Sequence, residues 1–178
     1  ATSKKEKDVF TYREKDIDNL IKKYRLWIEQ GCMCIYTGRP INISTLFDGS
    51  NMVDIEHTLP RSQSFDDSLE NQTLSYAYIN REVKQNLLPS QLDNYDDILQ
   101  RIKPWQEKVK RLENVCNYWS KKAKSAPDKT AKDKAIRQRH YWRMELDYWR
   151  GKVNRFTMKE IPSNYRNNQL VDTSIITK

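Results

Sequence analysis

The chain has 178 residues and a net charge of +8, and 37% of its residues are hydrophobic, 31% charged and 11% aromatic. The aromatic content argues against a disordered chain, and no apolar run approaches the roughly 20 residues of a membrane-spanning helix. We therefore expect one helix-rich soluble domain, with room for an appended subdomain, no membrane partner and a polyanionic partner.

The first clear helix is expected over residues 12–30, after a linker at residues 1–12. Apolar residues recur there at spacings of three and four, which predicts one apolar helix face. These residues are Ile17, Leu20, Ile21, Tyr24, Trp27 and Ile28. Gly31 is well placed to end the helix.

The three cysteines do not form a zinc-binding pattern. Cys32 and Cys34 are separated by one residue rather than the usual two, and no second pair follows. We favour packing of small apolar side chains over a structural zinc site. An odd number of cysteines also argues for a reducing compartment.

A β-β-α pattern follows the first helix. Residues 41–47 fit either a short helix or a strand, and residues 48–51 form a turn. Residues 52–59 are expected to form a strand ended by Pro60, and residues 61–71 a polar loop. A second strand is predicted at residues 72–75, and Ser75 is expected to cap a helix that runs to about Lys84.

The second half of the chain predicts a long helical hairpin. Apolar residues from Tyr95 to Trp119 keep a spacing near three and a half, and Pro104 marks either a kink or the first turn of a second helix. A turn at residues 125–128 precedes a helix over residues 129–152. We expect Trp105, Trp119 and Trp149 to lie in the core.

The basic runs 121–124 and 137–139 leave two readings open. They fit contacts with a nucleic-acid backbone and a solvated helix face equally well.

The stretch 53–60 places a carboxylate beside a histidine, and Asn80 follows on the predicted helix. Glu56 and Asn80 offer the hard oxygen ligands that magnesium prefers, and His57 can take a proton from water near neutral pH. Asp54 is expected either to orient the imidazole or to support a metal ligand from behind, and Lys84 to neutralise phosphate charge. These parts suit metal-assisted cleavage of a phosphodiester.

Two observations weigh against this interpretation. Neighbours on a regular strand point to opposite faces, so Glu56 and His57 can share one phosphate only if the strand twists or breaks near Pro60. A lone histidine beside a strand is also more often structural than catalytic. On the residues alone, a nuclease site and an ordinary strand and turn both stay open.

Several blocks in order resemble the HNH nucleases, and in particular the HNH domain of the RNA-guided effector nucleases of type II CRISPR systems, the Cas-nine family. The central blocks are residues 54–62 (DIEHTLPRS), 66–71 (DDSLEN), 80–81 (NR) and 84 (K). Further similar blocks are residues 34–38, 140–143, 156–159, 169–173 and 176–178. The resemblance spans roughly residues 31–178.

The resemblance implies a role for each matching residue. His57 would be the general base, Glu56 and Asn80 the ligands of Mg²⁺, with Mn²⁺ as a substitute, and Asn71 a supporting residue. Lys84 matches a family lysine loosely, because its spacing from Asn80 differs by one residue in some relatives. Glu56 stands where many relatives have Asp.

The implied fold is α+β and mainly helical: a small ββα-metal HNH core with a preceding helix and a long following αα-hairpin. The expected organisation is a linker at 1–12, a helix plus HNH core at 13–92, a helical subdomain at 93–162 and, at 163–178, an exit linker toward a RuvC-like domain. The chain is expected to be an excised domain of a longer protein.

The implied function is one-metal hydrolysis of the DNA strand paired to a guide RNA. The implied partners are that strand in the RNA–DNA heteroduplex, the guide RNA through the full-length parent, and the parent's RuvC-like and recognition domains. The implied setting is antiviral defence in the bacterial cytoplasm. Two alternatives stay open: a non-catalytic nucleic-acid-binding module of the same fold, and a free-standing HNH homing or restriction endonuclease.

Overall fold

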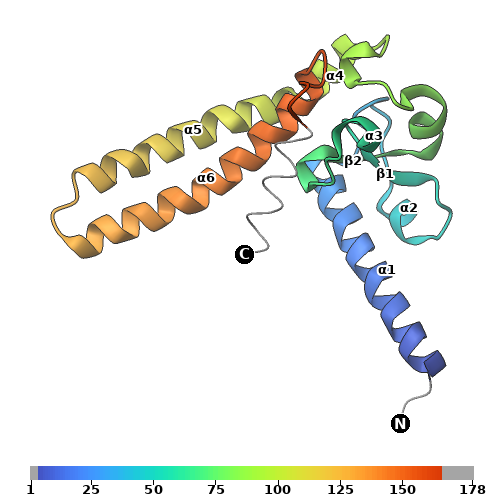
Figure 1. Ribbon diagram of the computed structural model, residues 1–178, viewed down its shortest axis with the longest axis horizontal. Coiled ribbons are helices and arrows are strands. Elements are labelled where there is room, and N and C mark those ends of the chain that lie inside the picture. The colour runs from blue at the N-terminus through green and yellow to red at the C-terminus, as the bar shows by residue number, and fades with distance from the viewer. Residues whose placement is uncertain (1–3, 166–178) are drawn as a thin grey trace. The chain divides into compact units, whose positions relative to one another are not determined.

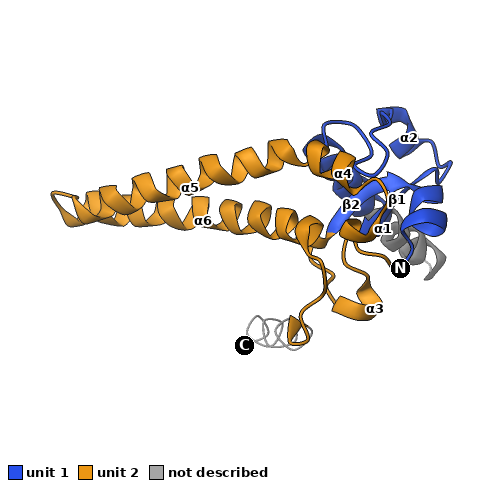
Figure 2. Ribbon diagram, turned by 90° about the horizontal axis from the view of Figure 1, so that it is seen from above, with its two compact units in different colours: residues 1–57, 72–86 blue, residues 58–71, 87–178 orange. Residues whose placement is uncertain are grey.

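The computed structural model describes the backbone of residues 4–165 and the side chains of residues 15–165 (Figure 1). The chain forms two compact units, one of residues 1–57 and 72–86 and one of residues 58–71 and 87–178 (Figure 2). The predicted domain boundaries stay predictions, and the proposed exit linker lies almost wholly outside the described residues. None of the described helices has the length and apolarity needed to cross a membrane.

The expected α+β, mainly helical fold is confirmed. The first unit contains α1 (Lys4–Glu29), α2 (Ile43–Phe47), β1 (Val53–His57), β2 (Gln72–Tyr76) and the π-helix η2 (Ile79–Lys84). The second contains α3 (Arg61–Ser64), the short 3₁₀ turns η1 (Leu69–Asn71) and η3 (Pro89–Gln91), α4 (Tyr95–Arg101), α5 (Lys103–Lys124) and α6 (Lys129–Thr157).

Helix α1 begins about two turns earlier than expected, at Lys4. Its first residues lack apolar periodicity, which suggested a linker, but they include no Gly or Pro to prevent a helix. The predicted end is confirmed, since Gly31 has a positive φ of 64° and the Cys32 N–H bonds to the Trp27 carbonyl.

The predicted apolar face of α1 is wrong in part. Leu26 and Gln30 are buried, whereas Ile17, Ile21 and Ile28 are more than half exposed, with Ile21 at 61%. Gln30 bonds the backbone of Leu74 through both its amide oxygen and its amide nitrogen. A polar side chain therefore joins this helix to β2, which apolar periodicity cannot predict.

Strands β1 and β2 form a two-stranded antiparallel sheet in which Val53 pairs with Tyr76 and His57 with Gln72. β1 ends two residues before the predicted Leu59. The predicted polar loop is partly helical, since α3 and η1 lie within it.

The predicted cap at Ser75 is wrong, because Ser75 is buried within β2 and pairs with Asp54. The helix after β2 starts later, at Ile79, and is wound as a π-helix in which the Gln85 N–H bonds to the Asn80 carbonyl.

In the second unit, α5 and α6 run side by side as the predicted αα-hairpin (Figures 1 and 2). Pro104 lies in the first turn of α5, as one of the two readings expected, and α6 extends past Lys152 to Thr157. Trp105 and Trp149 are buried with ring centroids 6.0 Å apart, which confirms them as core residues. Trp119 is only half-buried, so its prediction was wrong.

Candidate active site

The residues predicted for catalysis lie mostly on β1 and η2 of the first unit. β1 pairs with β2 through His57 and ends there, so no break separates Glu56 from His57. Glu56 is 1% exposed, whereas His57 is half-buried. The two side chains therefore begin from opposite faces of the strand.

Glu56 is held by three side chains. Its Oε1 accepts hydrogen bonds from the Tyr36 hydroxyl, at 2.5 Å, and from the Thr73 hydroxyl. Its Oε2 lies 3.1 Å from Lys84 Nζ as an ion pair. Burial, together with the nearby Glu56 charge, raises the pKa of Tyr36 well above its usual range, so Tyr36 stays a neutral donor.

Lys84 points into the interior rather than toward solvent. It is 1% exposed, and its ammonium also donates a 2.8 Å hydrogen bond to the carbonyl of His57. In this position it balances the charge of Glu56 and fixes the backbone at the end of β1. The expected contact with a substrate phosphate stays a prediction.

Asp54 pairs with Arg81 of η2 at 3.3 Å. The prediction that Asp54 orients the imidazole is not supported by this placement. Asp54 and His57 are three residues apart on a regular strand, which directs their side chains to opposite faces.

Asn80 lies half-buried in the first turn of η2. No described side chain is hydrogen-bonded to its carboxamide, although its backbone carbonyl accepts from Gln85. Its amide oxygen therefore has the capacity to bind a ligand.

Glu56 and Asn80 carry oxygen atoms of the kind that a hard divalent cation binds. No group of three His, Cys, Asp or Glu side chains able to hold a metal occurs among the described residues, but the predicted set needs only Glu56 and Asn80. Glu56 Oε2 is buried and accepts no hydrogen bond, so its one close partner is the Lys84 ammonium.

Asn71 belongs to the second unit and is fully buried. Its Oδ1 accepts from the Leu59 N–H at 2.8 Å, and its Nδ2 donates to the carbonyls of Leu59 and Asp66. It therefore braces the loop that follows β1, and the supporting role that the resemblance implied stays a prediction.

Asp66 anchors the same loop to α6, and the sequence did not reveal it. Its Oδ2 accepts from Arg155 Nε at 2.8 Å and from the Tyr165 hydroxyl, and its Oδ1 accepts from Ser68. Burial alone would raise the pKa of Asp66, but the bonds from Ser68 and Tyr165 and the charge of Arg155 outweigh it and lower that pKa.

Thr73 and Tyr36 are also partners that the sequence reasoning missed. Thr73 lies directly opposite Glu56 in the strand register, so a correct alignment of the two strands would have found it. Tyr36 comes from a loop twenty residues upstream, and no local pattern signals its contact.

Residues 34–90 match the HNH endonuclease family. The CRISPR-associated endonuclease Cas9 1 of Streptococcus thermophilus is 41% identical over 97 residues, which cover 53% of this chain and 9% of that protein. The CRISPR-associated endonuclease Cas9 of Campylobacter jejuni is 45% identical over 69 residues, which cover 39% of this chain and 7% of that protein. The chain thus spans less than a tenth of the length of these curated relatives.

Among solved structures, a crystal structure of Streptococcus thermophilus Cas9 in complex with the AGAA PAM is similar, with 39% identity and a TM-score of 0.45. That similarity covers 49% of this chain and 9% of the solved chain.

Proposed function

We propose that this chain hydrolyses a DNA phosphodiester, with His57 as general base and with Glu56 and Asn80 as metal ligands, because residues 34–90 match the HNH endonuclease family and the chain is similar to the Cas9 endonucleases named above. The observation that carries the proposal is the placement of Glu56, His57 and Asn80 within the segment that matches the HNH endonuclease family. The unpartnered carboxamide of Asn80 supports it.

Each residue has a definite task in this proposal. A ring nitrogen of the His57 imidazole takes the proton of the attacking water, while Lys84 holds the His57 carbonyl in place. Tyr36 and Thr73 fix the orientation of the Glu56 carboxylate through Oε1. A Mg²⁺ ion at Glu56 and Asn80, with Mn²⁺ as a substitute, would supply Lewis-acid stabilisation to the scissile phosphate.

The proposed substrate is the DNA strand paired with a guide RNA, and the chain would act as a nickase of that strand. Both relatives named above are CRISPR-associated endonucleases, and the matched segment is a small part of each. Guide RNA and the RuvC-like and recognition domains are therefore proposed partners within a longer protein, in the bacterial cytoplasm.

The cleavage test compares wild type with His57→Ala on single-stranded and double-stranded DNA in the presence of Mg²⁺. We expect wild type to nick DNA and His57→Ala to lose at least about a hundredfold in rate. His140→Ala is the matched control, because His140 is the other histidine of the chain and lies exposed on α6. Equal cleavage by wild type and His57→Ala would remove His57 from the mechanism.

A second measurement does not depend on activity. Mn²⁺ binding, followed by electron paramagnetic resonance, should weaken in Glu56→Gln and in Asn80→Ala and stay unchanged in Asp54→Asn. Unaltered Mn²⁺ affinity in both ligand variants would favour the non-catalytic nucleic-acid-binding alternative. Efficient site-specific cleavage of duplex DNA without any guide would favour the free-standing homing or restriction endonuclease instead.

A further inference from the structure

The end of the α5–α6 hairpin has a strong surplus of basic over acidic side chains. Residues 118–139 include eight basic and two acidic side chains, so this segment has a net charge of +6, against +8 for the whole chain. The lysines of this segment are all exposed. Such a concentration of one sign of charge attracts polyanions.

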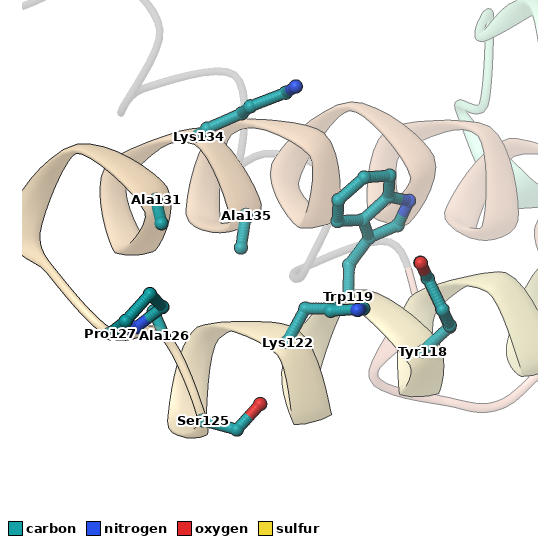
Figure 3. A pocket seen from close by; sticks show the side chains of 9 residues that line it. All are labelled: Tyr118, Trp119, Lys122, Ser125, Ala126, Pro127, Ala131, Lys134 and Ala135. Carbon is teal, nitrogen blue, oxygen red and sulfur yellow. The ribbon is translucent and has the colours of Figure 1, made fainter.

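A cavity of about 330 Å³ lies between the two helices at this same end (Figure 3). In Figure 3, Trp119 reaches from α5 toward α6, and the methyl groups of Ala131 and Ala135 face it from α6. Ala135 is buried here, so the helices pack against each other beside the cavity, and the small side chain of Ala131 leaves room in the cavity itself. Its volume lies at the lower end of small-ligand sites, about 300–1,000 Å³.

The lining combines aromatic rings with ammonium groups. The rings of Tyr118 and Trp119 lie edge to face with centroids 5.1 Å apart, and Tyr118 is 52% exposed. Lys122 Nζ lies 5.6 Å from the centre of the Tyr118 ring. Lys134 is the lysine that lines the cavity from α6. Aromatic rings beside cationic side chains are the parts that proteins use to hold an unpaired base and its phosphates.

The N-terminus of α6 lies at this end of the hairpin as well. Its N-cap, Asp128, is a carboxylate whose side chain already accepts the Ala131 N–H at 2.8 Å. The cap already occupies the Ala131 N–H, so the positive charge of this end comes mainly from lysine and arginine side chains.

We propose that the end of the α5–α6 hairpin binds single-stranded nucleic acid. One unpaired base enters the cavity against Trp119 and Tyr118, and its flanking phosphates lie at Lys122 and Lys134. A base that is stacked and paired within a duplex cannot enter such a cavity. The inference goes beyond the proposed function, because binding here requires neither His57 nor cleavage.

The experiment uses the full chain carrying His57→Ala, so that the oligonucleotide stays intact. Fluorescence anisotropy measures the affinity of this protein for a labelled oligo-dT and for a matched abasic strand over a series of salt concentrations. Lys122→Ala with Lys134→Ala should lower the slope of log K against log salt by about 1.4, at about 0.7 per phosphate contact. The control removes two exposed lysines of α5 outside the cavity, Lys103→Ala with Lys110→Ala, and should leave the slope unchanged.

Ala131→Leu tests the cavity without altering charge or removing the indole. It should weaken binding of oligo-dT by about tenfold and leave binding of the abasic strand unchanged, because stacking of the base is lost. Equal affinity of the parent protein for the two strands would overturn the base-binding site. Equal slopes for the two lysine double variants, or tighter binding to duplex DNA or to polyglutamate than to oligo-dT, would overturn the proposal as a whole.

Discussion

The β-hairpin of the first unit and the helical hairpin of the second surround their buried charged side chains differently. Around β1 the interior holds a carboxylate and an ammonium group, Glu56 and Lys84, each tied to several partners. Between α5 and α6 aromatic rings dominate: Trp105 packs edge to face on Phe156 at 5.6 Å, and the buried Lys152 ammonium lies 5.5 Å from the centre of the Trp105 ring. The first region depends on polar groups being satisfied and the second on burial of apolar surface, so they should respond differently to substitution.

The largest expected effect is that of Lys84→Met, which leaves the buried Glu56 carboxylate without a counter-charge. Breaking one side of a buried ion pair costs about 3–5 kcal/mol. Urea unfolding followed by circular dichroism should show this loss. Glu56→Gln combined with Lys84→Met should recover most of it, because no uncompensated charge then remains, and a double variant less stable than Lys84→Met would contradict the ion-pair account.

A smaller effect is expected for Asp66→Asn, which removes the charge that Arg155 and Tyr165 contact in the second unit. Hydrogen bonds to a charged group contribute about 1.5–3 kcal/mol, and we expect a loss in that range at pH 7. The measurement is the free energy of unfolding of both proteins.

The difference in stability between wild type and Asp66→Asn should also depend on pH. The folded-state pKa of Asp66 is lowered, so its contribution is fully present above the unfolded value of about 3.9 and is lost as pH falls through the lower folded value. The stability difference between wild type and Asp66→Asn should therefore be constant from pH 5 to pH 7, to within about 0.5 kcal/mol, and narrow below about pH 4. A difference that widens on acidification would show that another group is responsible.

The smallest effect on stability is expected for an ion pair on the protein surface. Arg143 and Asp147 form an ion pair on the surface of α6 at 3.8 Å, with both side chains more than 60% exposed. Arg143→Ala should change the free energy of unfolding by less than about 0.5 kcal/mol, because solvent screens exposed pairs. A loss of unfolding free energy as large as that expected for Lys84→Met would contradict the difference between buried and exposed ion pairs.

Local patterns predicted the order of the elements well. The helical hairpin, the two strands and the stop at Gly31 depend on periodicity and on single residues that end helices, and these act over a few positions. The HNH blocks likewise pointed to the stretch around His57 before any geometry was known. The patterns did not predict where α1 begins, at Lys4, or that η2 is wound as a π-helix.

Partners far apart in sequence could not be predicted. Arg155 meets Asp66 across 89 positions, and Lys84 turns inward to Glu56 although a lysine is ordinarily expected at the surface. Such contacts depend on which elements pack together, which no single segment encodes. The same limitation explains Trp119, whose periodic position predicted full burial although its side chain is only partly buried and lines a cavity.

The π-helix η2 gives this region a tolerance for change in length. A turn closed between Gln85 and Asn80 takes up one residue more than an α-helical turn. Val83, within that turn, is 49% exposed, so its side chain is not needed for packing. A chain shorter by this residue would close an ordinary α turn, with both strands and their register unmoved, so the spacing between the asparagine and the lysine is free to vary by one position.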